Sequence, residues 1–429
     1  MTYRYLEGED HRMNIGRVAQ TLTVSALTFA HLACGDGLAP VVDEPGDQSD
    51  GRITITNDQT ELDVRVRYLD AEVPIVPVAG AVPARASAAS QLRAFSLRLK
   101  AEVLPPAIDG QVLQATAIAM RGDRATVSYN VRGDQYLGGI DVFNISEKSR
   151  PKLRSEALFN DTDINSVAID EGNVYMATAT GDPSYPYPAV LEVMQLRSEK
   201  LVLEGNQSVP LTSFAATSVV IPAKTVYATS GSAGALTAID QGTLTPTSSI
   251  DLHDARWVDV AGGKVVVVQG TPGQISVYDE QTLQLLGQYG FTGADIPESK
   301  STVAVVGGKA FIAAGTGGVQ ILSVNTGAVV GSIPLPDPAA LGLDPSVVVT
   351  NAVAVDGDLV FISNGEAGVY VAQGSQSFDE TGSEEQQQIT LLGKLQFDDL
   401  QSVNHVAIKN NYLIIASGLG GLKTVEVLN

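Results

Sequence analysis

One hairpin pattern recurs seven times in the last three-quarters of the chain. Each copy has a short apolar strand, a polar turn of two or three residues, and a second apolar strand that ends at Gly, Ser or Asn. The seven copies begin at Thr116, Asn165, Thr217, Trp257, Ser301, Asn351 and Asn404. Aligned on their first strands, the copies are separated by 39 to 53 residues, a period typical of propeller blades with four strands each. The pattern therefore predicts an all-β protein, a seven-bladed β-propeller of four-stranded blades.

The blade pattern also sets the bounds of the propeller. We predict that it spans residues 91–429, because third and fourth strands follow most of the hairpins. The sixth copy carries an acidic low-complexity insert, residues 373–388, which is expected to project into solvent. The seventh copy ends without an outer strand, and an open ring would expose two sheet edges. Residues 94–103 (AFSLRLKAEV) alternate correctly and are predicted to supply that strand.

The N-terminus has the pattern of an export signal. From Met13, which we consider beside Met1 as the true start, a basic residue and then a mostly apolar run lead to Cys34. Residues 1–34 therefore resemble a bacterial lipoprotein signal, in which the cysteine becomes the lipidated first residue of the mature protein. The sequence departs from that pattern at His31, where such signals carry Leu or Val. An ordinary cleaved signal or an N-terminal anchor is the alternative.

Two segments connect this signal to the propeller. Residues 35–51 contain five acidic residues, no basic ones and several Gly and Pro, which predicts a solvated, flexible stalk. Residues 52–90 contain two alternating segments, RITIT and LDVRVRYL, and then a Pro/Ala-rich connector. These residues are predicted to form either a short β-hairpin packed on the propeller or a flexible spacer, and the sequence leaves both open.

Composition excludes several classes of function. The formal net charge is −21 and no Lys/Arg-rich run occurs, which argues against nucleic-acid binding, because the phosphate backbone demands clustered basic residues. The single cysteine excludes an internal disulfide, a CxxCH haem site and a cysteine-based zinc site. Hydrophobic residues make up 44% of the chain, enough for a sizeable core.

The first hairpin copy resembles a known repeat type. TAIAMRGDRATVSYN is followed by GGIDVFNISEKSRPKL, which looks like the LVIVD-type repeat, a strand followed by G-L-x-I-x-D-x-S-x-P-x-x-P. The I-x-D element is clear elsewhere only at Ile239 and Asp240. Proteins with this repeat are mostly cell-surface or periplasmic and have no assigned activity. The resemblance therefore implies a location in the bacterial cell envelope and no particular chemistry.

The residues that lead into the first strands form a candidate binding site. Propellers place their sites around the central channel, and here small polar and amide side chains converge on that axis. The predicted ligand-binding residues are Asn165, Thr217, Trp257, Thr302, Asn351, Asn404 and His405, with Thr116 at the equivalent position of the first copy. An amide-rich ring suits sugar hydroxyls, a water cluster or a hard cation. The alternative is that these side chains cap strand ends and bind channel water.

Aromatic loops form a second candidate site. The loops of the first two copies carry Tyr136, Tyr185 and Tyr187. These residues are predicted to form a lip that stacks on a sugar ring or a peptide, because tyrosine offers a large contact area at a low entropic cost. The alternative is that the rings pack against each other or against the N-terminal segment.

Residues suited to catalysis are scarce. After removal of the signal only His253 and His405 remain, so a three-histidine metal site is excluded, and His405 is the one acid/base candidate at the channel. Calcium is the only candidate cofactor. Its nearest carboxylates are Asp163, Asp254 and Asp259, which form no convincing calcium site. No nucleophile elbow, P-loop or HExxH motif occurs.

These observations favour a binding or scaffold module over an enzyme. We predict an exported, lipid-anchored monomer at the cell envelope that binds a protein or a glycan, with no nucleic-acid partner and no membrane contact beyond its lipid. The alternative is a calcium-assisted hydrolase or lactonase with its site at the channel mouth. Calcium-dependent hydrolysis that is lost on changing Asn351 or Asn404 would favour the enzyme.

Overall fold

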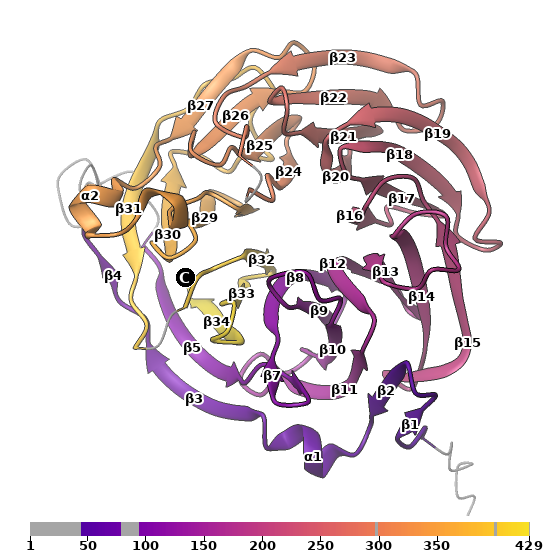
Figure 1. The fold of residues 1–429 in the computed structure, drawn as a ribbon. Helices are drawn as coiled ribbons and strands as arrows, with labels where there is room; N and C mark the ends of the chain where they lie inside the picture. Colours follow the sequence, from indigo (N-terminus) through magenta and orange to yellow (C-terminus); the bar gives the residue numbers. More distant parts are fainter. Residues whose placement is uncertain (1–43, 79–93, 297–298, 399–400, 429) are drawn as a thin grey trace, which may run out of the picture. The chain divides into compact units, whose positions relative to one another are not determined.

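A computed structural model of the chain describes residues 44–78, 94–296, 299–398 and 401–428. Within residues 44–429, seven antiparallel sheets surround a central channel, so the predicted seven-bladed β-propeller is confirmed (Figure 1). The predicted signal and its lipidated Cys34 lie outside the described residues. Helices are few and short in the described ranges, and none of them has the length and apolar character needed to cross a membrane.

The first four blades follow one another along the chain, each with its innermost strand first. Blade 1 contains β8 (Gln114–Arg121), β9 (Arg124–Asn130), β10 (Gly138–Asn144) and β11 (Lys152–Phe159). Blade 2 contains β12 (Thr162–Ile169), β13 (Asn173–Thr180), β14 (Ala189–Arg197) and β15 (Lys200–Pro210). Blade 3 contains β16 (Ala216–Val220), β17 (Thr225–Ser230), β18 (Ala233–Asp240) and β19 (Pro246–His253). Blade 4 contains β20 (Ala255–Ala261), β21 (Lys264–Gln269), β22 (Gln274–Asp279) and β23 (Leu285–Gly290).

The last three blades repeat this arrangement, and a loop with a short helix, α2 (Pro338–Leu341), separates the first two of them. Blade 5 contains β24 (Val303–Val306), β25 (Lys309–Ala313), β26 (Val319–Ser323) and β27 (Val329–Ile333). Blade 6 contains β28 (Ala352–Asp356), β29 (Leu359–Ser363), β30 (Val369–Gly374) and β31 (Ile389–Leu395). Blade 7 contains β32 (His405–Lys409), β33 (Tyr412–Ala416), β34 (Leu422–Leu428) and β5 (Ser96–Val103).

Tight turns close the first hairpin of several blades. In blades 4, 5 and 7 both turn residues have positive φ, at Gly262-Gly263, Gly307-Gly308 and Asn410-Asn411. Positive φ at both positions is the type I′ turn, whose twist agrees with the right-handed twist of paired strands. Gly and Asn adopt this conformation more readily than other residues. The polar turns seen in the sequence therefore fix the register of these hairpins.

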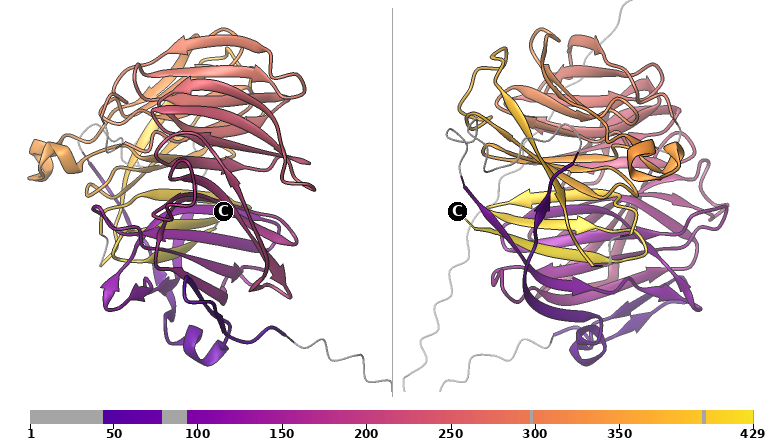
Figure 2. Two further views of the ribbon diagram at one scale, coloured as in Figure 1. Left: turned by 45° about the vertical axis from the view of Figure 1, so that its right-hand side comes forward. Right: turned by 90° about the vertical axis from the view of Figure 1, so that its left-hand side faces the viewer.

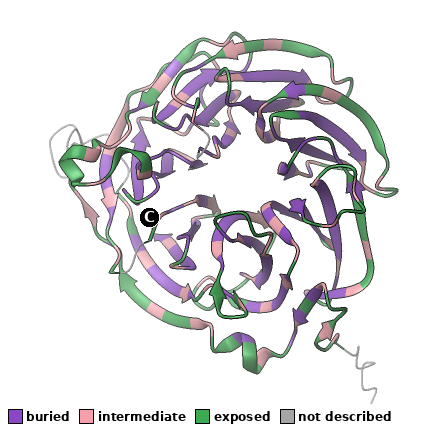
Figure 3. Cartoon of the chain, in the orientation of Figure 1, coloured by how far each residue is buried: buried purple, intermediate pink, exposed green. Residues whose placement is uncertain are grey.

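Burial is greatest in the middle strands of a blade and least in its outermost strand (Figure 3). In blade 3, β17 is buried almost throughout, whereas β19 is largely exposed. The core lies between blades rather than within them: one cluster joins Val266 and Ile275 of blade 4 to Val303 and Ile312 of blade 5. Each blade is thus stabilised by its two neighbours, as in other repeat architectures.

The seventh blade is completed from the N-terminal side, as predicted. β5 pairs antiparallel with β34, from Leu97 opposite Val427 to Val103 opposite Leu422. Three strands from the end of the chain and one from its beginning therefore share a sheet, and this pairing closes the ring (Figure 1). With the ring closed, blade 7 packs against blade 1 through a shared apolar cluster.

Residues 44–76, which we call the strap, run along the outer edges of three consecutive blades (Figures 1 and 2). β2 (Ile53–Thr56) pairs with β11 of blade 1, and β3 (Val66–Glu72) pairs with β5 of blade 7. β4 (Ile75–Val76) pairs with β31 of blade 6. The strap therefore adds a further strand to each of these blades.

The two alternating segments of residues 52–90 form no hairpin with each other. A short helix, α1 (Gln59–Asp63), separates them, with the Asp58 side chain as its N-cap and Leu62 buried beneath it. Each segment instead pairs with a different blade, because the outer strand of every blade offers an unpaired edge. This arrangement replaces the short hairpin that the sequence suggested.

The strap begins inside the segment predicted to be a flexible stalk. Glu44 lies 2.8 Å from Lys200 of blade 2, and the Asp47 carboxylate accepts the backbone N–H of Asn57 at 2.5 Å. β1 (Gln48–Ser49) pairs with β2. Glu44 therefore finds a basic partner on the propeller, and Asp47 finds an N–H partner within the strap. The rest of the predicted stalk lies outside the described residues.

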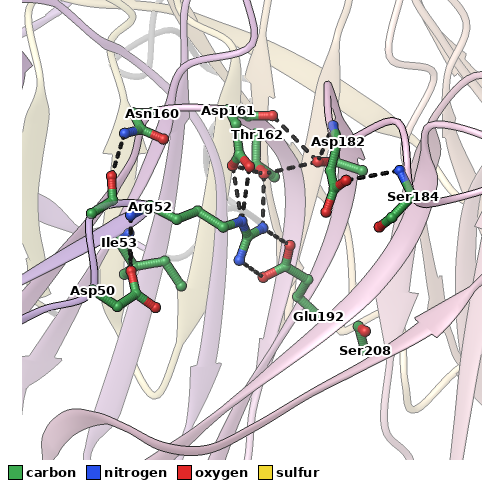
Figure 4. A network of polar contacts seen from close by, with 12 residues as sticks. Asp50, Arg52, Ile53, Asn160, Asp161, Thr162, Asp182, Ser184, Glu192 and Ser208 are labelled. Carbon is green, nitrogen blue, oxygen red and sulfur yellow. Dashed lines mark hydrogen bonds and ion pairs between the residues drawn. The ribbon is translucent and has the colours of Figure 1, made fainter.

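Arg52 of the strap joins blade 1 to blade 2 (Figure 4). Its Nε donates to Asp161 in the connection between these blades at 2.9 Å, and its terminal nitrogens contact Thr162 and Glu192 of blade 2. Burial raises the pKa of the Glu192 carboxyl, and the neighbouring guanidinium opposes that rise. The strap thus supplies the charge that a buried carboxylate of blade 2 requires.

The insert of blade 6 packs on blade 5, so the expectation that it projects into solvent is wrong. Phe378 is 1% exposed and lies edge-on to Phe311 of blade 5, with 4.9 Å between ring centroids. The Lys309 ammonium donates to the Thr381 hydroxyl at 2.7 Å. One phenylalanine anchors an otherwise polar segment. The acidic, low-complexity composition of the segment therefore did not indicate that it packs on the propeller.

Candidate functional site

Three cavities surround the channel axis. The mouth cavity, of about 500 Å³, lies over blades 2 to 5, and the polar cavity, of about 780 Å³, lies over blades 6, 7 and 1. Both are lined by the loops that lead into first strands and by the loops between second and third strands, so they share one face, which we call the mouth face. The channel itself, of about 490 Å³, is lined by all seven first strands.

The predicted ring residues all lie on these cavities. Asn165, Thr217 and Trp257 line the mouth cavity, Asn351 and Asn404 line the polar cavity, and Trp257, Thr302 and His405 line the channel. The structure therefore gathers the residues that the sequence placed around the axis. Their role in ligand binding stays a prediction.

Most polar groups of this ring are bonded to the neighbouring blade. One side chain at each blade junction bonds a backbone group across it, and these bonds run around the whole ring. The seven bonds are Thr116 Oγ1 to Ile164 O (3.0 Å), Asn165 Nδ2 to Ala216 O (2.9 Å), Thr217 Oγ1 to Ala255 O (2.8 Å), Val305 N to Asp259 Oδ2 (2.8 Å), Val353 N to Thr302 Oγ1 (3.2 Å), Ser363 Oγ to Val403 O (2.7 Å) and Asn404 Nδ2 to Ala115 O (2.8 Å). Small polar side chains recur at the channel because they hold adjacent blades together.

Trp257 and His405 both line the channel, and Trp257 also lines the mouth cavity. They come from opposite parts of the ring, blades 4 and 7, and their ring centroids lie 5.3 Å apart at an angle of 32°. Burial and, to a lesser extent, the positive charge of Lys300 together lower the pKa of His405 to about 3. The imidazole is therefore neutral near pH 7, which argues against the acid/base role suggested by the sequence.

Lys300 reaches across the mouth of the channel. It precedes blade 5, yet its Nζ donates to Thr116 O of blade 1 at 2.8 Å and to Asn165 O of blade 2 at 3.4 Å. No carboxylate pairs with it among the described residues. Burial lowers the pKa of the Lys300 amine to about 7. A lysine with these surroundings is typical of a functional site rather than of a solvated loop.

Arg256 holds the loop that carries Lys300. Its Nη1 donates to three backbone oxygens of that loop, those of Ala294, Ile296 and Ser299, at 2.8 to 3.0 Å. Its Nε and Nη2 pair with the Asp254 carboxylate at 3.0 and 2.8 Å. All hydrogen-bonding nitrogens of the guanidinium are thus occupied within the protein, so Arg256 positions the loop and offers no charge to a ligand.

The rest of the mouth cavity combines one exposed aromatic ring with hydroxyl and carboxylate groups. Phe214 is 59% exposed and lines the cavity together with Ser232 and Thr271. Asp295 also lines it and accepts the Thr271 hydroxyl at 3.0 Å. An apolar wall with a few fixed polar groups is the usual form of a small-molecule site.

The polar cavity contains an amide oxygen without a partner. Asn351 is 8% exposed, and its Oδ1 is buried and accepts no hydrogen bond among the described residues. A buried acceptor of this kind costs free energy unless water or a ligand satisfies it. Asn351 is thus the one residue of the predicted ring whose amide oxygen is buried without a partner among the described residues.

The three tyrosines of the predicted lip lie apart from these cavities. Tyr185 exchanges a hydrogen bond with Ser208 of β15 at 2.7 Å, and Tyr187 is 51% exposed. Tyr136 packs against Gly181, where an added methyl group would come 3.1 Å from its ring. Two of the rings are therefore engaged within blades 1 and 2, and only Tyr187 faces solvent freely.

The carboxylates considered for calcium are each engaged elsewhere. Asp254 pairs with Arg256, Asp259 accepts from blade 5, and Asp163 accepts the backbone N–H of Leu137 at 3.2 Å. Across the described ranges, no three His, Cys, Asp or Glu side chains gather closely enough to share a metal ion. Calcium binding stays a prediction. A calcium ion at the channel mouth would need amide and backbone oxygens as its ligands.

Lys300, Arg256 and Phe214 were not predicted from the sequence. The repeat pattern aligns only positions adjacent to each first strand, and all three residues lie in or beside loops of variable length. A lysine in a polar loop and an arginine at the start of a strand are ordinarily solvated. Nothing in the sequence indicated that these two would be held by backbone oxygens from other loops and blades.

No protein-family model and no curated protein sequence matches this chain. Solved structures similar to it include the computationally designed protein Ika8, with 16% identity over 78% of this chain and 93% of that chain and a TM-score of 0.46. BamB from Moraxella catarrhalis has 12% identity over 84% of this chain and 97% of that chain, also with a TM-score of 0.46. At these identities and scores, neither likeness bears on function.

Proposed function

We propose that this chain is a binding module of the bacterial cell envelope whose mouth cavity takes a small ligand with an apolar or ring-shaped face. The observation that carries the proposal is the cavity of about 500 Å³ with Trp257 and Phe214 in its wall. Bonds between adjacent blades hold that wall in place before a ligand arrives, which lowers the entropic cost of binding. A glycan or the side chain of a protein partner would present such a face.

Binding is expected to change the fluorescence of Trp257, which is the only tryptophan in the chain. We would titrate the protein with panels of sugars, aromatic acids and short peptides, with a chelator present. A saturable change in emission at micromolar to millimolar concentration is expected for at least one class. Because no other tryptophan contributes, any such change reports on the surroundings of Trp257, which are the mouth cavity and the channel.

Two variants with exposed aromatic residues give a matched comparison. Phe214→Ala removes a ring from the cavity wall and is expected to weaken binding about tenfold, since such a contact is worth roughly 1 to 2 kcal/mol. Tyr187→Ala removes a ring of similar exposure that lies outside the cavity and is expected to leave binding unchanged. Equal effects of both variants would contradict the proposed site.

The envelope location and the lipid anchor are part of this proposal. The signal pattern supports both, and the resemblance to LVIVD-type repeats, itself still a prediction, supports the location. The unaltered chain is expected to partition into detergent and to incorporate labelled palmitate. Cys34→Ser is expected to abolish incorporation. Equal palmitate incorporation by the unaltered protein and by Cys34→Ser would contradict the lipoprotein assignment. An unchanged periplasmic yield of Cys34→Ser would favour an ordinary cleaved signal.

The calcium-assisted hydrolase is distinguished by the same titration. A fluorescence response that requires calcium, together with ester or lactone hydrolysis lost in Asn351→Ala or Asn404→Ala, would favour the enzyme. A response that survives chelation supports the binding module.

A further inference from the structure

The hydrogen bonds of Lys300 fit a neutral amine. A protonated lysine has three N–H donors, whereas a neutral one has two N–H donors and a lone pair. Two acceptors face Nζ among the described residues, Thr116 O and Asn165 O. Both donors of a neutral amine are therefore satisfied, and no residue in the described ranges donates to its lone pair.

The position of this amine gives it access to a ligand. Lys300 lines the mouth cavity beside Trp257 and Ser299. Its loop is fixed by Arg256, and its amine is fixed by two blades on the far side of the channel. The nitrogen is thus held at one end of a cavity large enough for a small molecule.

We propose that Lys300 captures aldehyde or ketone groups of ligands in the mouth cavity as an imine. The nitrogen lone pair attacks the carbonyl carbon, and the carbonyl oxygen takes up a proton that the nitrogen loses. The resulting carbinolamine releases water, so that one C=N bond replaces the C=O bond. The step consumes no oxidant or reductant, and water reverses it.

The lowered pKa of Lys300, about 7 because of burial, supports this chemistry. Near pH 7 about half of such amines are neutral, against roughly one in a thousand or fewer for an ordinary lysine. Desolvated lysines of this kind are the ones that proteins use to form Schiff bases. Lys309 and Lys394 also have pKa values lowered by burial, but neither lines the mouth cavity.

The ligand class follows from the wall around the amine. Trp257 and Phe214 favour a carbonyl group attached to an aromatic or otherwise apolar body, and the hydroxyl groups of the cavity accommodate the open-chain form of a reducing sugar. This inference rests on the proposed function in that it places the chemistry in the same cavity.

Benzaldehyde with sodium cyanoborohydride tests the proposal on the full chain, because the reductant converts an imine into a stable benzyl amine. Peptide mapping by mass spectrometry then gives a rate for each lysine. At pH 7 Lys300 is expected to react at least about tenfold faster than the exposed Lys224. Between pH 8.5 and pH 7 the rate at Lys300 is expected to fall less than about threefold in all, whereas the rate at an ordinary exposed lysine falls about tenfold per pH unit. Equal rates, or the same pH dependence at both lysines, would overturn the proposal.

Two substitutions sharpen the result. Lys300→Arg keeps donors for the two carbonyl oxygens but forms no imine, so the fast adduct is expected to disappear, while Lys224→Arg is expected to leave it unchanged. A fast adduct that persists elsewhere in Lys300→Arg would overturn the assignment. The peptide-resolved rates of the unaltered protein decide the question even if Lys300→Arg fails to fold.

Benzyl alcohol separates this inference from the proposed function. It has the same ring and no carbonyl group, so it reports on binding alone through Trp257. A saturable response to both compounds without an adduct at Lys300 would overturn the imine and leave the binding module standing. An adduct at Lys300 without a response to any non-carbonyl ligand would support the imine and remove the proposed general binding role.

Discussion

Replacement of Arg65 by methionine is expected to lower the free energy of unfolding by about 3 to 5 kcal/mol, because it leaves buried carboxylates without a counter-charge. Arg65 belongs to the strap, and its terminal nitrogens donate to both oxygens of Asp141 at 2.9 and 2.7 Å. The Asp141 side chain is fully buried in blade 1. The same guanidinium contacts Glu156 of β11. Urea denaturation followed by circular dichroism measures the loss.

The strap offers a matched control two residues away. Arg67 also pairs with a carboxylate, at 3.6 Å from Glu102, but its side chain is 74% exposed. Exposed pairs contribute roughly 0 to 1 kcal/mol, so Arg67→Met is expected to have little effect. If the two variants were equally stable, the buried network would have no special role in attaching the strap.

The second large effect expected is a fall in stability as the pH rises from about 5 to 7.5. Burial raises the pKa of Asp163 to about 7, opposed by the N–H of Leu137. Burial and the charge of Asp141 raise the pKa of Glu156, opposed by Arg65. These groups bind protons more tightly in the folded than in the unfolded state, so raising the pH through this window favours unfolding. The free energy of unfolding changes by about 1.4 kcal/mol for each tenfold change in proton affinity, and a total fall of roughly 2 to 4 kcal/mol is expected.

Other groups reverse this trend outside that window. The pKa of Asp70 is lowered to about 2 by Arg98 and Lys100, so its contribution is lost as the pH falls below about 4. Lys300 has a folded pKa of about 7, below its usual value. Its unfolded form therefore holds the proton more tightly, and stability is regained as the pH rises from 7 toward 10. Stability is thus expected to pass through a minimum near pH 7 to 8.

Denaturation curves at pH 5, 6, 7.5 and 9 test this profile. Asp163→Asn keeps the size of the side chain and removes the titrating group, so it is expected to flatten the fall between pH 5 and 7.5. Asp123→Asn changes an exposed aspartate and is expected to leave the profile unchanged. A profile that rises steadily from pH 5 to 7.5 would contradict the role given to the buried carboxyls.

The blades were predictable from sequence because each is built from local hairpins. Apolar alternation marks the strands, and residues such as Gly262 and Gly307 mark turns that need positive φ. The strap was not predictable in the same way. Alternation around Ile53 indicates a strand, but its partner in β11 lies about a hundred residues away, and every outer strand of a propeller offers an edge of similar chemistry.

The site was predictable in position and only partly in role. Asn165 and Asn404 lie at the channel, as expected, but their amides bond backbone oxygens of the next blade. Such partners exist only once the ring is closed, so no local pattern reports them. Lys300 was not predicted for the same reason. The backbone oxygens of Thr116 and Asn165 that accept hydrogen bonds from its amine belong to blades far away in the sequence.

The pairing of β5 with β34 also constrains how the protein is made. Val103 lies opposite Leu422, so the seventh sheet joins two strands that lie about 320 residues apart in the sequence. During translation the blades already formed therefore lack a closed neighbour, and contacts this distant in sequence form slowly. A nascent chain must be kept from aggregation until its last strand emerges. Loss of only the seven residues of β34 would leave β5 without its partner and the ring open at the seventh blade.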